Sequence, residues 1–293
     1  MSDHRSDSSS NNLLAIGLPV YNGKLHIRET IESILGQTMS RLKLVIADNA
    51  STDGTDEICR EYASRDSRIL YLRNHENLGI NANTVRAYQE SRPSTYFALI
   101  GHDDVWKPRF AEKMISLLVG DPGASLAFSY YEYIDENGRV LPRREITAPY
   151  ARIIKMKDQG RRHRICFQPS AALMSGVVRA ESIDPVLIER RYGVYEDVLI
   201  LRSLAAQGHF LLHPELLFLK RRHRESYSSS PEYRQENRWI NCRLASRTLR
   251  KHENLTVGET IHLWLSLVGF FHFKKPGLKQ WNRMKRIMGK AAA

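Results

Sequence analysis

Two adjacent carboxylates, Asp103 and Asp104, follow a short apolar segment and precede Pro108. Neighbouring like charges repel and raise each other's pKa, so such a pair is costly to keep ionised. A divalent cation removes that cost, and carboxylate oxygens suit Mg²⁺ or Mn²⁺. An ion held there can neutralise the charge that grows on a departing diphosphate. Alone, the pair is equally compatible with a turn or a helix N-cap.

Two further features fit a ligand-binding edge. Asp48 ends another apolar segment in a loop rich in Asn, Ser, Thr and Gly, where it can accept a hydrogen bond from a base N–H or a ribose hydroxyl. Gly79, after Asn77-Leu78, permits a ligand to approach the backbone closely. Turn chemistry explains both residues equally well.

Candidate acid–base and basic groups lie later in the chain. Asp197, beside Glu196 at a predicted helix start, can act as a general base on an acceptor hydroxyl, although the helix dipole also favours an acidic first turn. His223 lies in the basic run 220–224 and can ligate the same metal ion, with phosphate held by its neighbours. A solvated basic turn is the alternative. The run lacks interleaved aromatic residues, which argues against nucleic acid as a partner.

The elements that position these residues alternate between apolar strands and amphipathic helices, which predicts an α/β fold with a mostly parallel sheet flanked by helices. The predicted strands are residues 13–20, 42–47, 69–72 and 96–100. Thr52 or Thr55 is the predicted N-cap of the helix after the second strand. Because parallel strands place their carboxyl ends along one edge, one site is expected from Tyr21, Asp48, Gly79 and Asp103.

The second half of the chain is less regular. Asn137-Gly138 predicts a hairpin turn. The other expected elements are a helix at 110–118, strands at 125–134 and 171–178, a mobile basic loop at 142–168, a helix at 195–208, and one or two short strands at 210–219.

The composition fits one large domain and an appendage. The 293 residues are 42 % hydrophobic, which is enough for a substantial core. Residues 1–12 are polar and aperiodic, which predicts a disordered leader rather than a secretory signal. Three scattered cysteines indicate a reducing cytosol. The net charge of +12 favours anionic partners, and its basic clusters lie after residue 122.

The C-terminal tail has an apolar segment followed by a basic one. Residues 261–273 are apolar and aromatic but reach only about half the length that spans a bilayer. Basic residues follow at 274–290. The pattern predicts a helix in an anionic membrane interface, at the inner face of the cytoplasmic membrane, or else a helix packed on the domain.

Taken in order, these segments resemble the motifs of family 2 glycosyltransferases with the GT-A fold. The matching segments are Gly17-Leu18-Pro19-Val20-Tyr21-Asn22-Gly23, Asp48-Asn49-Ala50-Ser51-Thr52-Asp53-Gly54-Thr55, Asn77-Leu78-Gly79 with Asn83, His102-Asp103-Asp104 with Pro108, Ser175-Gly176-Val177-Val178-Arg179, and Glu196-Asp197. The resemblance implies a GT-A domain at 13–230, divided into a nucleotide-binding half at 13–108 and an acceptor half at 109–230. A helical basic tail at 231–293 would follow.

The resemblance also implies an activity. It is the inverting transfer of a sugar from a nucleoside-diphosphate sugar, preferably with a pyrimidine base, to a hydroxyl of a saccharide or lipid-linked acceptor in bacterial surface polysaccharide or glycolipid synthesis. Asp197 would be the catalytic base, and Asp48 would contact the nucleotide base. The implied nucleotide-sugar contacts are Pro19, Tyr21, Asn22, Asp48, Gly79, Asn83 and Asp103, and the implied ligands of Mg²⁺ or Mn²⁺ are Asp103, Asp104 and His223.

Two departures from the family pattern stand out. Gly101 occupies the place of the first acid in an Asp-x-Asp motif, so Asp103 is expected to be the primary metal ligand and His223 its helper. Gln235-Glu236-Asn237-Arg238-Trp239 matches the Gln-x-x-Arg-Trp motif of processive synthases. It is either a chance pentapeptide or an acceptor site in which Trp239 and Glu196 take part.

Two other classes of protein fit the sequence less well. A sugar-nucleotide nucleotidyltransferase would carry a Gly-rich, basic phosphate loop after the first strand, where this chain has Pro-Val-Tyr-Asn-Gly. A non-catalytic module that binds anionic glycans or membranes would not need Asp103, Asp104 and Asp197.

Overall fold

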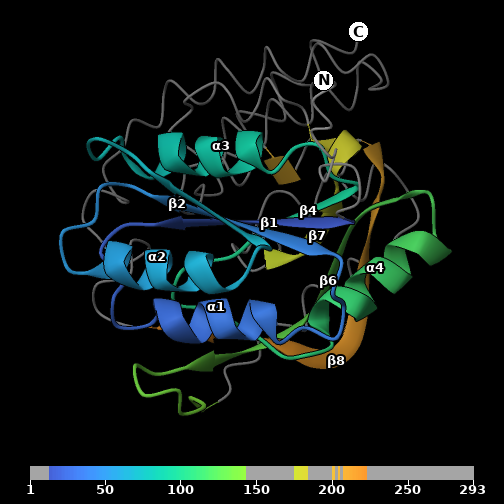
Figure 1. Cartoon of the computed structure of the whole chain (residues 1–293). Coiled ribbons are helices and arrows are strands. Elements are labelled where there is room, and N and C mark those ends of the chain that lie inside the picture. The colour runs from blue at the N-terminus through green and yellow to red at the C-terminus, as the bar shows by residue number, and fades with distance from the viewer. Residues whose placement is uncertain (1–12, 143–174, 184–199, 202–203, 205–206, 223–293) are drawn as a thin grey trace, which may run out of the picture. The chain divides into compact units, whose positions relative to one another are not determined.

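The computed structural model describes residues 13–142, 175–183, 200–201, 204 and 207–222, which form one sheet flanked by helices (Figure 1). The strand order is β3-β2-β1-β4-β7-β6-β8-β5. The strands are β1 (Leu14–Val20), β2 (Leu42–Asp48), β3 (Ile69–Arg73), β4 (Tyr96–Leu99), β5 (Val105–Trp106), β6 (Ala124–Ile134), β7 (Val177–Arg179) and β8 (His209–Arg221). The helices are α1 (Ile27–Leu35), α2 (Thr55–Arg65), α3 (Ile80–Glu90) and α4 (Phe110–Gly120), with a short 3-10 helix at Ala180–Ser182. The predicted α/β class is confirmed.

The first half of the sheet is parallel. β1 pairs with β2 and β4, and β2 pairs with β3, all in the same direction. β1 and β2 are buried on both faces, as expected of parallel strands covered by helices on either side. The four predicted strands are confirmed to within one residue at each end, so the segments that follow β1, β2, β3 and β4 all emerge at one edge.

The second half of the sheet is mixed. β7 is antiparallel to β4 and β6, β6 is parallel to β8, and β5 is antiparallel to β8. The segment at 210–219 forms one strand of 13 residues, β8, whose pairing with β6 shifts register near Tyr130. The two-residue strand β5 was not predicted, because so short an element has no periodicity to detect.

The two faces of the sheet carry separate apolar clusters. α1 and α2 lie on one face and α3 on the other (Figure 1). The larger cluster joins α1 and α4 to the sheet through residues that include Ile31, Met114 and Trp106. The smaller cluster joins α3 to β4, β6 and β7, with Tyr88 edge-on to Phe97 at 5.1 Å between ring centroids.

One helix start differs from the prediction. The N-cap of α2 is Gly54, in the left-handed conformation, and not Thr52 or Thr55. The threonines serve contacts between loops instead: the hydroxyl of Thr55 accepts a hydrogen bond from the amide of Gly23 at 2.9 Å, and the amide of Thr52 donates to Asn22 Oδ1 at 2.9 Å. The hairpin turn at Asn137-Gly138 is confirmed by a bridge between Ile134 and Val140.

Several predictions concern residues outside the described ones. They include the leader at 1–12, all but the first residue of the loop at 142–168, the tail at 231–293 and most of the helix at 195–208. In the described part of the chain, no helix has the length and apolar content needed to cross a membrane.

Candidate active site at the carboxyl ends of the strands

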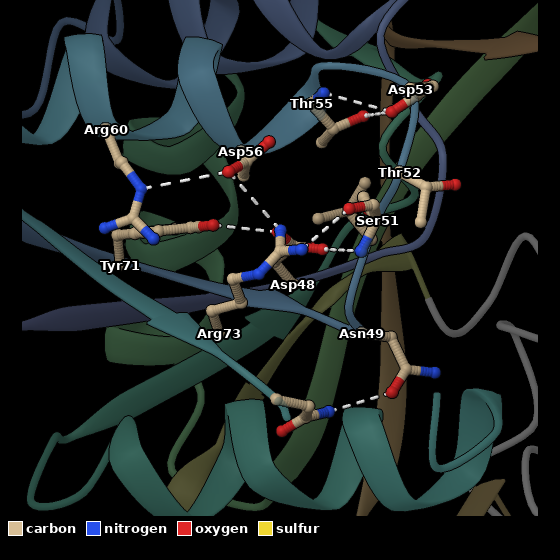
Figure 2. Close-up of polar contacts among 12 residues, drawn as sticks. Asp48, Asn49, Ser51, Thr52, Asp53, Thr55, Asp56, Arg60, Tyr71 and Arg73 are labelled. Carbon is tan, nitrogen blue, oxygen red and sulfur yellow. Dashed lines mark hydrogen bonds and ion pairs between the residues drawn. The ribbon is translucent and has the colours of Figure 1, made fainter. Parts of the chain in front are cut away.

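Asp48, the last residue of β2, is a fully buried carboxylate surrounded by donors. Its exposed fraction is 0 %. Oδ1 accepts from the amide of Ser51 at 2.9 Å, and Oδ2 accepts from the Tyr71 hydroxyl at 2.8 Å and from Arg73 Nη1 at 2.9 Å. Figure 2 shows Tyr71 and Arg73 reaching Asp48 from the neighbouring strand β3. Three protein donors therefore hold the residue that was predicted to contact a nucleotide base.

Arg73 links Asp48 to the surface. Its side chain is 32 % exposed, and its guanidinium lies 3.5 Å from Asp56 and donates to the carbonyl of Ser51 at 2.9 Å (Figure 2). Burial, together with the hydrogen bond to Asp48, raises the pKa of Tyr71. Sequence reasoning missed both residues of β3, because the rule that picked residues at strand ends selected Gly79 after β3, although Arg73 is the last residue of that strand.

The loop after β1 is bound to the loop after β2. The amide of Asn22 donates to Ser51 Oγ at 2.9 Å, and that of Lys24 donates to Asp53 Oδ2 at 3.0 Å. Tyr21, in the same loop, is 44 % exposed. Tyr21 and Asn22 thus stand at the edge as predicted, on a loop fixed by its backbone.

The other side of this loop lies against His102. A Cβ atom at Gly23 would be 2.6 Å from Cδ2 of His102 and 2.7 Å from Cγ2 of Val20. Only glycine permits so close an approach without a shift of neighbouring atoms. The loop after β1 therefore touches both the Asp48 loop and the turn that contains Asp103.

The two adjacent carboxylates fold back over Gly101. A Cβ atom at Gly101 would lie 2.8 Å from Asp103 Oδ1 and 3.1 Å from Asp104 Oδ2. The absence of the usual first acid is thus part of the local geometry, because an aspartate at 101 would displace the other two carboxylates. Asp103 is partly exposed, whereas Asp104 is 5 % exposed.

Asp104 is mainly an interior group. Burial raises its pKa to about 7, the charge of Lys220 opposes that rise, and the charge of Asp103 adds to it. Its Oδ1 accepts a hydrogen bond from the amide of Arg221 at 3.0 Å. A cation beside the pair would favour the ionised form of both carboxylates.

The donor set fits a magnesium or manganese ion that is completed by a ligand. Such ions commonly use one or two carboxylates together with substrate phosphates, and Asp103 and Asp104 direct oxygens toward the same space above Gly101. Among the described residues, no group of three or more His, Cys, Asp or Glu side chains could hold a metal ion. The predicted third ligand, His223, lies outside those residues, two positions after Arg221.

A buried amide network lies behind the loop after β3. Asn83 is 2 % exposed, and its Nδ2 lies 2.6 Å from the carbonyl of Ala47 and 3.4 Å from that of Val20. Its Oδ1 accepts from Asn74 Nδ2 at 3.0 Å. These contacts give Asn83 a structural role that ties α3 to the ends of β1 and β2; a direct contact with the nucleotide sugar stays a prediction.

The remaining predicted residues are partly placed. Pro19 is half-buried in β1 beside Ala47, and Gly79 is exposed at the N-cap of α3, with open space where a Cβ would be. Four residues lie outside the described chain, and their roles stay predictions: Glu196, Asp197, His223 and Trp239.

Comparisons with known proteins identify the family of the chain. The family model of glycosyl transferase family 2 matches residues 15–179, more than half of the chain. The chain is 29 % identical over 178 residues to an uncharacterized glycosyltransferase of Methanocaldococcus jannaschii, covering 60 % of each protein. It is 29 % identical over 129 residues to TuaG of Bacillus subtilis, a putative teichuronic acid biosynthesis glycosyltransferase, covering 44 % of this chain and 50 % of that one.

Solved structures share the fold. TarS of Staphylococcus aureus, residues 1–349, gives a TM-score of 0.65 at 15 % identity, covering 92 % of this chain and 77 % of that one. A mannosyltransferase of Pyrobaculum calidifontis gives a TM-score of 0.55 at 15 % identity, covering 97 % and 82 %.

The chain belongs to glycosyl transferase family 2. The predicted GT-A architecture and family are both confirmed. The chain spans 60 % of the length of its Methanocaldococcus jannaschii relative and half of TuaG.

Proposed function

We propose that the protein is a metal-dependent, inverting glycosyltransferase that uses a nucleoside-diphosphate sugar. The observation that carries this proposal is the contact of three strand-end segments. The loop after β1 is hydrogen-bonded to the Asp48 loop through Asn22 and packs through Gly23 against His102, next to Asp103. A base-binding carboxylate and a metal-binding carboxylate on one edge are what a nucleoside diphosphate requires.

The donor is proposed to carry a pyrimidine base. TarS has been solved with UDP and with UDP-GlcNAc, whereas the Pyrobaculum mannosyltransferase has been solved with GDP-Man and Mn²⁺. An ionised carboxylate offers about four acceptor positions, and three donors hold Asp48. Asp48 is fully buried, whereas Arg73, which pairs with it, is 32 % exposed. The base is therefore proposed to meet the partly exposed Arg73 before it reaches Asp48.

Asp197 is proposed to take the proton of the acceptor hydroxyl. The acceptor oxygen forms a bond to the anomeric carbon of the sugar while the bond between this carbon and the phosphate oxygen breaks. This displacement inverts the configuration at the anomeric carbon. The diphosphate leaves with the bonding electron pair, and the proton stays on the carboxylate. A divalent ion, when bound, neutralises charge on the diphosphate, and Asp103, Asp104 and His223 are the residues proposed to hold it.

The acceptor is proposed to be a hydroxyl group on a saccharide or on a lipid-linked molecule, in the synthesis of a bacterial surface polysaccharide or glycolipid. TuaG, one of the relatives, has a name that refers to teichuronic acid biosynthesis.

The basic tail is proposed to contact an anionic membrane. Removal of residues 257–293 should then abolish co-flotation with anionic vesicles; unchanged flotation would argue for a tail packed on the domain.

The test of the donor proposal is a thermal-shift screen of UDP, GDP, CDP and ADP on the full chain, with and without Mn²⁺. We expect UDP to raise the melting temperature most, and only with Mn²⁺ present. Transfer is then measured with the corresponding UDP-sugars. No shift with any diphosphate would contradict the proposal, and a shift with GDP alone would contradict the pyrimidine preference.

A matched pair of variants tests the catalytic base. Asp197→Asn should abolish transfer and leave UDP binding unchanged, whereas Glu181→Gln, at an exposed carboxylate that follows the end of β7 at the opposite edge of the sheet, should retain most transfer. Equal loss in both variants would contradict the assignment of Asp197.

A further inference from the structure

Arg221, the last residue of β8, is a buried cation with several partners. Its side chain is 1 % exposed. Nε donates to the carbonyl of Asp103 at 3.0 Å, and Nη1 donates to the carbonyls of Asp135 at 2.8 Å and Glu136 at 3.2 Å. Nη2 forms an ion pair with Glu29. A guanidinium removed from water is tolerated only when its donors are satisfied in this way.

The partners of Arg221 belong to three separate parts of the fold. Glu29 lies on α1, Asp103 lies in the turn between β4 and β5, and Asp135 and Glu136 lie in the hairpin after β6. The main-chain amide of Arg221 also donates to Asp104 Oδ1 at 3.0 Å. Arg221 thus contacts the carboxylate turn through its side chain and through its backbone.

α1 holds the same turn from another side. The hydroxyl of Thr30, a fully buried residue, lies 2.9 Å from the carbonyl of His102 and 2.9 Å from that of Asp104. Together, Thr30 and Arg221 engage the carbonyls of three consecutive residues, His102, Asp103 and Asp104. The backbone that carries the two carboxylates is fixed from two directions.

We propose that Arg221 is a positioning residue of the donor site, which sets the affinity of the Asp103–Asp104 turn for a divalent cation and diphosphate. The inference rests on the proposed function. Metal ligands must be placed to within a few tenths of an ångström, and a site of this kind depends on the groups that hold its ligands. Lysine keeps the charge at 221, but a single ammonium cannot reproduce a planar fork that bonds partners in three directions.

The main experiment compares Arg221→Lys with Arg179→Lys. Arg179 is a matched control because its guanidinium also binds backbone carbonyls, those of Leu118, Ala124 and Asp121. It pairs with Tyr96 at the start of β4, whereas the carboxylate turn follows the end of that strand. Both variants lose an arginine with multiple carbonyl partners, but only one of them borders the site.

The measurement is calorimetric titration of Mn²⁺ into the full chain saturated with UDP, or with GDP if UDP does not bind. Melting of the unliganded protein is recorded in parallel. We expect Arg221→Lys to weaken Mn²⁺ binding at least tenfold and Arg179→Lys to change it less than twofold, although both melt at a lower temperature. Binding of Mn²⁺ to folded Arg221→Lys within twofold of the parent would overturn the inference.

A second pair of variants serves if Arg221→Lys does not fold. Thr30→Val removes the hydroxyl that binds the turn from α1, and Thr30→Ser keeps it. We expect Thr30→Val to weaken Mn²⁺ binding several-fold and Thr30→Ser to restore it; equal affinity in both would overturn the inference. If the parent chain binds neither diphosphate in the presence of Mn²⁺, the proposed function itself fails, and the inference that depends on it fails too.

Discussion

The two acidic residues of the candidate site, Asp48 and Asp103, are held in opposite ways. At the end of β2, the side chain of Asp48 is the acceptor, and donors from Ser51, Tyr71 and Arg73 converge on its carboxylate. In the turn between β4 and β5, the backbone carbonyls of His102, Asp103 and Asp104 take the hydrogen bonds from α1 and β8. Asp48 therefore contributes to the stability of the fold, whereas Asp103 is presented on a scaffold that other residues stabilise.

The largest expected effect concerns the partly exposed carboxylate of Asp103. Asp103→Asn should lower the catalytic efficiency of sugar transfer about 100-fold or more, because a neutral amide is a poor ligand for a hard cation. The free energy of unfolding should change by less than about 0.5 kcal/mol, as for partly exposed positions. Excess EDTA should abolish transfer by the parent protein. Full activity in excess EDTA, or large destabilisation in the variant, would contradict the role assigned to Asp103.

The next effect concerns the buried carboxylate. Asp48→Asn should lower the free energy of unfolding by about 1–3 kcal/mol, since it removes the ion pair with Arg73 and places an amide against two donors. Asp56→Asn is the matched control, because Asp56 is the other carboxylate near Arg73, at 3.5 Å, and is partly exposed. We expect that control to cost less than about 0.5 kcal/mol in urea unfolding. Equal losses would show that burial of Asp48 is not decisive.

A smaller effect isolates one donor to Asp48. Tyr71→Phe removes the hydroxyl that bonds Oδ2 and should destabilise the protein by about 1.5 kcal/mol. In the double variant with Asp48→Asn, the loss of unfolding free energy should be smaller than the sum of the losses in the two single variants, because both changes remove the same hydrogen bond. Strict additivity in urea unfolding would contradict the contact.

The smallest effect is a pH dependence of stability that comes from the thiol of Cys59, a buried residue of α2. Burial raises the pKa of the Cys59 thiol to about 12, and the negative charge of Asp48 contributes to the rise. An unfolded thiol ionises near pH 8.5, so above that pH the unfolded state binds fewer protons and stability falls as pH rises toward 12. Between pH 8 and 9.5, the parent should lose about 1 kcal/mol more than Cys59→Ala. Parallel pH profiles in urea unfolding would argue against a buried thiol.

The sequence was sufficient where a feature depends on local pattern. The apolar runs of β1, β2, β3 and β4 predicted the parallel half of the sheet, and the strand-end rule placed Tyr21, Asp48 and Asp103 on one edge. Within the described residues, the positions of these three side chains along the edge follow from the ends of the strands and the register between neighbouring strands.

The sequence was insufficient where a polar residue has a distant partner. Arg221 belongs to a basic run that was interpreted as a phosphate contact or a solvated turn, yet it lies in the interior against Glu29, 192 positions away. Asn83 was predicted to contact the nucleotide sugar, and no pattern in the sequence indicated that its amide also bonds Asn74 and carbonyls of β1 and β2. No periodicity distinguishes an interior polar group from an exposed one when its partners come from elsewhere in the chain.

The position of β8 between β6 and β5 has a consequence for how the protein is made. β8 ends 117 residues after Asp104, yet its last amide completes the carboxylate turn. A ribosome that has delivered only the parallel half of the sheet has therefore produced the Asp48 end of the proposed donor site without the strand that completes the carboxylate turn. Contacts of such long sequence separation form late and slow the folding of a domain. Nascent chains released before residue 209 should accordingly lack any metal-dependent affinity for the donor, even where β1 to β4 have already formed.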